Sequence, residues 1–252
     1  MRTAPVPAPV LLDRRPEAAV RLYCLPPGGS GPEFYQLWAD LLPPAVEPYT
    51  VALPGRGDRR EEPSVTDLSA LVAALASLTG DDADPRPFAL FGHSLGALLA
   101  YETARRLGRT GRREPVLVAL SALPAPHQGD LDKLLATLLM SGIDAFTDIV
   151  GPVPAELLED PVTVTRLCTP FLADLVLALH HRHQDEPPLE MSLALYGGAA
   201  DPLVPPELLE RWNDLFTTPA TPCLFAGRHT YPQDQAPDLA RQLAKDLQTA
   251  AR

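Results

Sequence analysis

Residues 87–108 contain the feature that most restricts what this chain can fold into. The short apolar run Pro87–Phe91 predicts a buried β-strand. It leads directly into the pentapeptide GHSLG at Gly92–Gly96. Helical spacing follows over Leu95–Leu107, and Gly108 is placed to cap that helix at its C-terminus. The chain therefore passes from a buried strand into a helix through one tight glycine turn.

Strands and helices alternate along most of the chain. Short apolar runs predict the strands, and apolar residues at helical spacing predict the helices. Strands are expected at Val20–Leu25, Tyr49–Leu53, Pro115–Leu120, Met191–Tyr196 and Pro222–Phe225, and helices at Thr66–Leu78, Pro206–Leu215 and from Ala236 to the end. This alternation is typical of an α/β fold in which helices flank a mostly parallel sheet. The length of 252 residues suits one such domain, residues 1–252, with an insertion.

The alternation breaks between about residues 127 and 188. This stretch looks helical, carries an excess of leucine and is interrupted by glycine and proline. It is too long for a simple connection between two elements, so it predicts a helical lid. Such a lid would supply apolar walls for a ligand, and Leu138, Leu139 and Phe171 are the candidates for lining its channel.

Charge and cysteine content argue against several classes of function. A net charge of −11 opposes nucleic-acid binding, which requires a positive surface. The chain has no run of 18 uncharged apolar residues, so no membrane span is expected, and residues 1–12 lack the pattern of a signal peptide. Three scattered cysteines favour neither a disulfide framework nor a zinc site. We expect a cytoplasmic protein with no metal and no other cofactor.

The GHSLG pentapeptide has the pattern of a nucleophile elbow, G-x-S-x-G. In an elbow the serine occupies a strained strand-to-helix turn, and the flanking glycines are needed because strand and helix come too close for a Cβ. The pattern is common by chance, but here an apolar strand precedes it and a helix follows. We therefore expect an α/β-hydrolase fold with Ser94 as nucleophile, and a purely structural turn is the alternative.

A serine hydroxyl needs a base, and the base needs a group that orients it. In this fold the histidine comes last in the chain. His229 follows the last expected strand in a Gly-x-His turn, so it should lie beside the elbow and act as the base. His93 adjoins the serine and is expected to pack in the interior. Three other histidines share a predicted helix, where a solvated face is favoured over a metal site: His180, His181 and His183.

Asp201 is the expected acid of the site. It follows the next-to-last predicted strand, and Pro202 restricts it to extended backbone, which suits a carboxylate held in one direction. An aspartate that only forms a turn is the alternative. Asp144 and Asp148 compete only if the acid comes from the lid.

An acyl transfer also requires donors for the oxyanion of its tetrahedral intermediate. The backbone N–H of Leu95, at the start of the helix after the elbow, is one candidate. The loop after the first long strand should supply the other. Pro26 and Pro27 have no N–H, so Gly28 is the first residue of that loop that can donate.

Together these residues resemble the type II thioesterases of polyketide and non-ribosomal peptide synthesis, and the resemblance covers nearly the whole chain. It rests on five motifs: Leu25–Gly29 followed by Phe34, Tyr35 and Trp38; Leu53–Arg60; Gly92–Ala97; Gly197–Pro202; and Gly227–His229. The motif LPGRGDRR at 53–60 is not shared by α/β-hydrolases at large. The family usually has Pro-His-Ala-Gly in the first loop and Gly-Gly-His in the last, where this chain has Pro-Pro-Gly-Gly and Gly-Arg-His.

The resemblance implies hydrolysis of acyl thioesters on the phosphopantetheine arm of acyl or peptidyl carrier proteins. In antibiotic biosynthesis this reaction removes wrong or stalled acyl units. The resemblance also implies a helical lid where the sequence indicates one. A hydrolase of free acyl-CoA or small esters is the second hypothesis, and a non-catalytic binding module with the same fold is the third.

An acidic carrier protein would need a positive patch on this acidic chain. Arg56, Arg59 and Arg60 follow the expected strand Tyr49–Leu53, so they should lie at the carboxyl edge of the sheet together with Ser94. We expect these arginines to form the docking loop. The alternative is that neighbouring acids neutralise the loop and that Arg56 is structural.

Overall fold

The computed structural model describes residues 6–80, 83–141, 156 and 159–251. Within them, one sheet has the order β1-β3-β2-β4-β5-β6-β7. Its strands are β1 (Ala8–Leu11), β2 (Val20–Leu25), β3 (Val46–Ala52), β4 (Phe88–His93), β5 (Leu117–Ser121), β6 (Ser192–Gly198) and β7 (Cys223–Phe225). Only β1 is antiparallel to its neighbour, so the expected mostly parallel sheet is confirmed.

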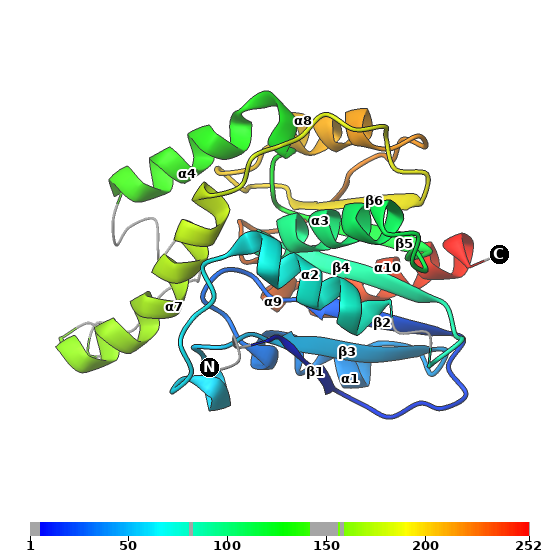
Figure 1. Cartoon of the computed structure of the whole chain (residues 1–252), viewed down its shortest axis with the longest axis horizontal. Helices are drawn as coiled ribbons and strands as arrows, with labels where there is room; N and C mark the ends of the chain where they lie inside the picture. Colours follow the sequence, from blue (N-terminus) through cyan, green and yellow to red (C-terminus); the bar gives the residue numbers. More distant parts are fainter. Residues whose placement is uncertain (1–5, 81–82, 142–155, 157–158, 252) are drawn as a thin grey trace.

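Helices flank this sheet on both faces (Figure 1). The α-helices are α1 (Trp38–Leu41), α2 (Leu68–Thr79), α3 (Leu95–Arg109), α4 (Asp130–Ser141), α7 (Pro161–Leu179), α8 (Pro206–Glu210), α9 (Tyr231–Asp234) and α10 (Ala236–Ala250). Short 3-10 turns are η1 (Pro32–Tyr35), η2 (Gly57–Arg59), η3 (Pro126–Gln128) and η4 (Arg211–Leu215).

The central strands are apolar throughout because both of their faces are covered. In β4, Leu90 packs on one face in the cluster that includes α2 and α3. Phe91 packs on the opposite face in the cluster that includes α1 and α10. Because both faces are buried, the sequences of these strands are unbroken apolar runs and do not alternate between apolar and polar residues.

The edge strand β1 was not expected. Its residues alternate between half-buried and exposed, and it contains Pro9. A proline is tolerated at an edge because it removes a donor that a central strand would need. The segment is short and pairs only with β3, so its tertiary position rather than its sequence makes it a strand.

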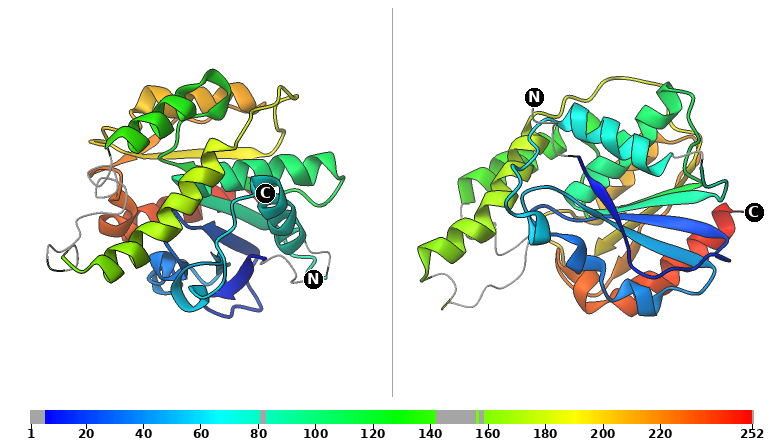
Figure 2. Two further views of the ribbon diagram at one scale, coloured as in Figure 1. Left: turned by 60° about the vertical axis from the view of Figure 1, so that its left-hand side comes forward. Right: turned by 60° about the horizontal axis from the view of Figure 1, so that its bottom comes forward.

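Helices α4 and α7 stand at one end of the sheet, and the first turns of α7 project away from the body (Figures 1 and 2). They fall inside the predicted lid segment, residues 127–188, of which residues 142–155, 157 and 158 are outside the described part. The competing acids Asp144 and Asp148 are among those residues. Among the described helices, α7 alone is long and apolar enough to cross a membrane, with a mean hydropathy of 1.6. Its residues Phe171 and Leu175 are nevertheless buried within the protein.

Candidate active site

Ser94 lies at the junction of β4 and α3 in a backbone conformation that non-glycine residues rarely adopt. Its φ is 53° and its ψ is −123°. A Cβ on Gly92 would lie 2.0 Å from the Gly96 carbonyl oxygen, and one on Gly96 would lie 2.1 Å from the Leu25 carbonyl oxygen. Both positions therefore require glycine, and the backbone has the form of the elbow that the pentapeptide predicts.

The side chain of His229 links Ser94 to Asp201. His229 Nε2 is 3.1 Å from Ser94 Oγ, and His229 Nδ1 is 2.8 Å from Asp201 Oδ2. The second oxygen of Asp201 accepts the backbone N–H of Leu203 at 2.9 Å and that of Val204 at 3.4 Å. All three linked side chains are buried. Their hydrogen bonds have the order of a nucleophile, its base and an orienting acid.

His93 is buried next to the three linked side chains of Ser94, His229 and Asp201. Its Nδ1 is 2.8 Å from Ser121 Oγ, which in turn lies 2.6 Å from the hydroxyl of Tyr231. The ring centre of His93 is 5.1 Å from that of His229. Burial, and then the neighbouring His229, hold the pKa of His93 well below its usual value. The ring is therefore neutral and packs in the interior, as expected from the sequence.

Gly28 and Leu95, the two expected oxyanion donors, line the same cavity as Ser94. Leu95 is the first residue of α3, so its N–H has no acceptor within the helix. A Cβ on Gly28 would lie 3.9 Å from the Leu95 Cβ, which puts the two residues side by side. The N–H of Gly29 is occupied, because it donates to Asp174 Oδ2 at 2.8 Å. This leaves Gly28 as the donor that the loop can offer.

A family model for the thioesterase domain matches residues 20–247. The chain belongs to the thioesterase family. The thioesterase PikA5 of Streptomyces venezuelae is 30% identical over 242 residues, which cover 92% of this chain and 82% of that protein.

Solved structures of similar proteins agree with this assignment. The thioesterase RedJ of the prodiginine pathway in Streptomyces coelicolor matches with a TM-score of 0.78 and 29% identity, over 91% of each chain. The type II thioesterase BorB of the borrelidin cluster matches with a TM-score of 0.77 and 28% identity, over 95% of this chain and 97% of that one. The family and fold expected from the sequence are confirmed, and the chain is an acyl thioester hydrolase.

The thioesterase has an apolar cavity that begins at Ser94. This space is partly open to solvent. Helices α3, α4 and α7 supply most of the wall: Leu98, Leu131, Leu134, Leu135, Leu138, Phe171, Leu175 and Ala178. Helices α4 and α7, the described helices of the segment 127–188, thus lie against the cavity at Ser94.

Two of the three predicted channel residues line this cavity. Leu138 and Phe171 are buried in its wall. The prediction is wrong for Leu139, which is 50% exposed and is absent from the wall. Neighbouring residues of a helix point about 100° apart, so Leu138 and Leu139 cannot both face inward.

The predicted docking loop is wrong for Arg56. Its side chain is buried and binds both carboxylate oxygens of Asp174, at 2.5 and 2.7 Å. Arg59 is held by Glu62 and by the Ala52 carbonyl oxygen. Arg60 alone of the three extends into solvent, with 66% of its side chain exposed and Glu61 at 3.6 Å. The loop is therefore largely neutralised by its own acids, which is the alternative interpretation of its sequence.

The predicted solvated histidine face is wrong for His181. This side chain is buried, and its Nε2 lies 2.9 Å from Glu102 on α3. Helix α7 ends at Leu179, one residue before His180, so the three histidines do not share a helix. Over the described part of the chain, no group of three or more His, Cys, Asp or Glu is arranged to hold a metal ion.

Sequence reasoning missed Asp174, which contacts the loop of Gly28 and Gly29. A signal for it exists in the sequence. Asp174 is the one charged residue in the apolar stretch 167–179, and a carboxylate buried on such a helix requires a partner. The sequence does not indicate which cationic side chain is that partner.

Proposed function

We propose that this thioesterase releases acyl groups from the phosphopantetheine arm of carrier proteins through a covalent intermediate on Ser94. The observation that carries the proposal is the hydrogen-bonded series Ser94–His229–Asp201, in which Ser94 lines an apolar cavity. A base in contact with a serine hydroxyl, itself oriented by a buried carboxylate, is what acyl transfer at a serine requires.

The first half of the reaction transfers the acyl group to the enzyme. His229 Nε2 accepts the Ser94 proton while Oγ bonds to the thioester carbonyl carbon. The carbonyl oxygen becomes an oxyanion, and the N–H groups of Gly28 and Leu95 are the donors that would stabilise it. When the C–S bond breaks, His229 returns the proton to sulfur. The products are acyl-Ser94 and a free phosphopantetheine thiol.

The second half returns the enzyme to its starting state. A water molecule gives a proton to His229 and bonds to the ester carbonyl carbon. The second tetrahedral intermediate uses the same oxyanion donors. Its collapse breaks the bond to Oγ, which takes the proton back from His229. The carboxylic acid product dissociates, and neither half of the reaction requires a cofactor.

The apolar wall of the cavity supports an acyl chain as the bound group. Leu138 and Phe171 face that space, and apolar walls with few polar groups suit a hydrocarbon. The similar protein BorB supports a biosynthetic setting, because it is a type II thioesterase from the borrelidin biosynthetic cluster. We place the protein in the cytoplasm, with an acyl or peptidyl carrier as its partner and Arg60 as its remaining candidate contact.

The decisive experiment for this proposal compares one acyl group on a carrier protein and on CoA. The same acyl group is presented on a phosphopantetheinylated carrier protein and on CoA, and kcat/KM is measured for each with Ser94→Ala as control. A higher kcat/KM for the carrier form supports the proposal. Equal or higher values for CoA would favour a free acyl-CoA hydrolase, and no Ser94-dependent turnover of either would favour a binding module.

A further inference from the structure

Asp174 on α7 is buried at the junction of three segments that are distant in the sequence. Its Oδ2 accepts the N–H of Gly29 at 2.8 Å and also Nη1 of Arg56 at 2.5 Å. Its Oδ1 accepts Nη2 of Arg56 at 2.7 Å. The side chains of Asp174 and Arg56 are only 3% and 4% exposed. One carboxylate therefore joins a lid helix, the loop after β3 and the loop after β2.

The contact between α7 and the loop after β2 is close. A Cβ on Gly29 would lie 3.1 Å from the Phe171 Cβ and 3.4 Å from its Cα, and Gly29 has a φ of +79°. Gly28, one residue earlier, is positioned against Asp174 and Leu95. The backbone at Gly28 and Gly29 is thus held by packing on α7 and by the hydrogen bond from Gly29 to Asp174.

We propose that Asp174 is a positioning residue for the oxyanion hole. It holds the Gly29 peptide, and through it the Gly28 N–H, at the place where the thioester oxygen develops charge. Arg56 fixes the direction of that carboxylate with two parallel hydrogen bonds. The inference rests on the proposed function, because it assigns Asp174 a role in the same reaction without contact with the substrate.

The hydrogen-bond inventory shows why a carboxylate is needed at this position. Three donors converge on Asp174: two from Arg56 and one from Gly29. An asparagine offers one acceptor oxygen and directs two N–H donors at the other partners. Asp174→Asn is nearly the same size, so it tests the charge and the acceptors rather than the packing.

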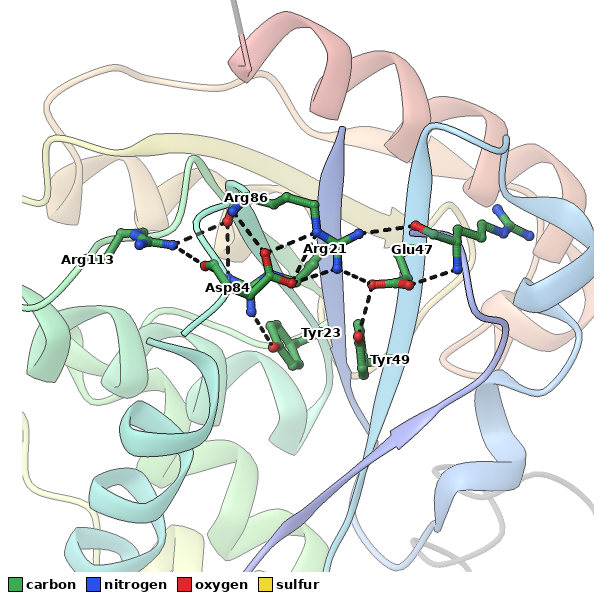
Figure 3. Close-up of polar contacts among 8 residues, drawn as sticks. Arg21, Tyr23, Glu47, Tyr49, Asp84, Arg86 and Arg113 are labelled. Atoms are coloured by element: carbon green, nitrogen blue, oxygen red, sulfur yellow. Dashed lines mark hydrogen bonds and ion pairs between the residues drawn. The ribbon is translucent and has the colours of Figure 1, made fainter. Parts of the chain in front are cut away.

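Glu47 provides a matched control at the opposite end of the sheet. It is the second residue of β3, whereas the active-site residues follow the carboxyl ends of their strands. Its Oε2 accepts Nη2 of Arg86 at 2.7 Å and the hydroxyl of Tyr49 at 2.9 Å, and both contacts are drawn in Figure 3. It also accepts a backbone N–H, that of Arg15, at 2.8 Å. Like Asp174, this buried carboxylate binds one guanidinium and one peptide N–H.

The test compares kcat, KM and melting temperature of Asp174→Asn and Glu47→Gln with the wild type. We expect both to melt at a lower temperature. Only Asp174→Asn should lower kcat, by about 10- to 100-fold with a KM change below about threefold, because removal of a whole oxyanion donor costs roughly 10²- to 10³-fold. A kcat within twofold of the wild type in folded Asp174→Asn would overturn the inference, as would an equal kcat loss in Glu47→Gln.

A second measurement separates positioning from general loosening. A trifluoromethyl ketone analogue of the acyl chain forms a tetrahedral oxyanion adduct with the serine, so its binding reports on the hole. Its affinity should fall in Asp174→Asn by the same factor as kcat/KM and stay unchanged in Glu47→Gln. If Asp174→Asn does not fold, Arg56→Lys is measured instead and should lower kcat and inhibitor affinity together; unchanged values would overturn the inference. A wild type without Ser94-dependent turnover would contradict the proposed function instead.

Discussion

The replacement Asp201→Asn should prevent His229 from acting as the base of the reaction while leaving the fold intact. Asp201 Oδ1 accepts the N–H groups of Leu203 and Val204, and Oδ2 accepts His229 Nδ1. An asparagine must keep its carbonyl oxygen toward the two backbone donors, because its NH₂ group cannot accept from them. The NH₂ group is then directed at His229 Nδ1.

This arrangement selects the wrong tautomer of His229. Nδ1 becomes the acceptor, so Nε2 carries the proton and cannot take another from Ser94 Oγ. In serine triads the equivalent change lowers kcat roughly 10⁴-fold. At 1.36 kcal/mol for each factor of ten, the activation free energy rises by about 5 kcal/mol.

The assay is thiol release from an acyl-pantetheine thioester, followed with a thiol-reactive dye, together with a thermal melt. The variant should melt within about 4 °C of the wild type, since a loss of 1 kcal/mol shifts the midpoint by roughly 2–4 °C in a protein of this size. Ser94→Ala is the control for complete loss of the nucleophile. A kcat for Asp201→Asn within tenfold of the wild type would show that the acid lies elsewhere.

Three other results are expected. Phe171→Ala should move the peak of kcat/KM toward longer acyl chains, because Phe171 lines the cavity wall, and an unchanged chain-length profile would remove Phe171 from specificity. Arg60→Glu should raise KM for an acyl-carrier substrate, more at low salt, and leave a small thioester unaffected; an equal effect on both would contradict a docking role. The free energy of unfolding should fall as the pH drops below about 6.5, because burial and the neighbouring His229 keep the pKa of His93 low in the folded protein while the unfolded ring takes up a proton. Urea titrations should give a contribution of up to about 1.4 kcal/mol per pH unit that disappears in His93→Phe, and the same slope in that variant would refute it.

The positions of the three linked side chains could be predicted because topology decides them. Parallel strands bring their carboxyl ends to one edge, so Ser94 after β4, Asp201 after β6 and His229 after β7 converge there. Each is also marked by a local pattern of glycine or proline. Hydrophobic periodicity likewise predicts helices on both faces, because each one must bury an apolar stripe.

Contacts between distant segments could not be predicted in this way. Arg56 and Asp174 are separated by 118 residues, and nothing in either local sequence names the other. The excess of leucine in the segment 127–188 indicates that this segment packs on an apolar surface. Whether Leu138 or Leu139 faces inward depends on the rotation of α4 about its axis. Rotation and pairing are set by tertiary packing.

Turnover by Ser94→Ala tests the central claim most directly. Wild type and variant are given the same acyl-carrier substrate, free acid is quantified, and circular dichroism confirms that both are folded. Because the covalent acyl-serine cannot form, kcat should fall by roughly 10⁶-fold, as in other serine hydrolases that lose their nucleophile. A folded Ser94→Ala that releases the acid at a rate close to that of the wild type would contradict the account.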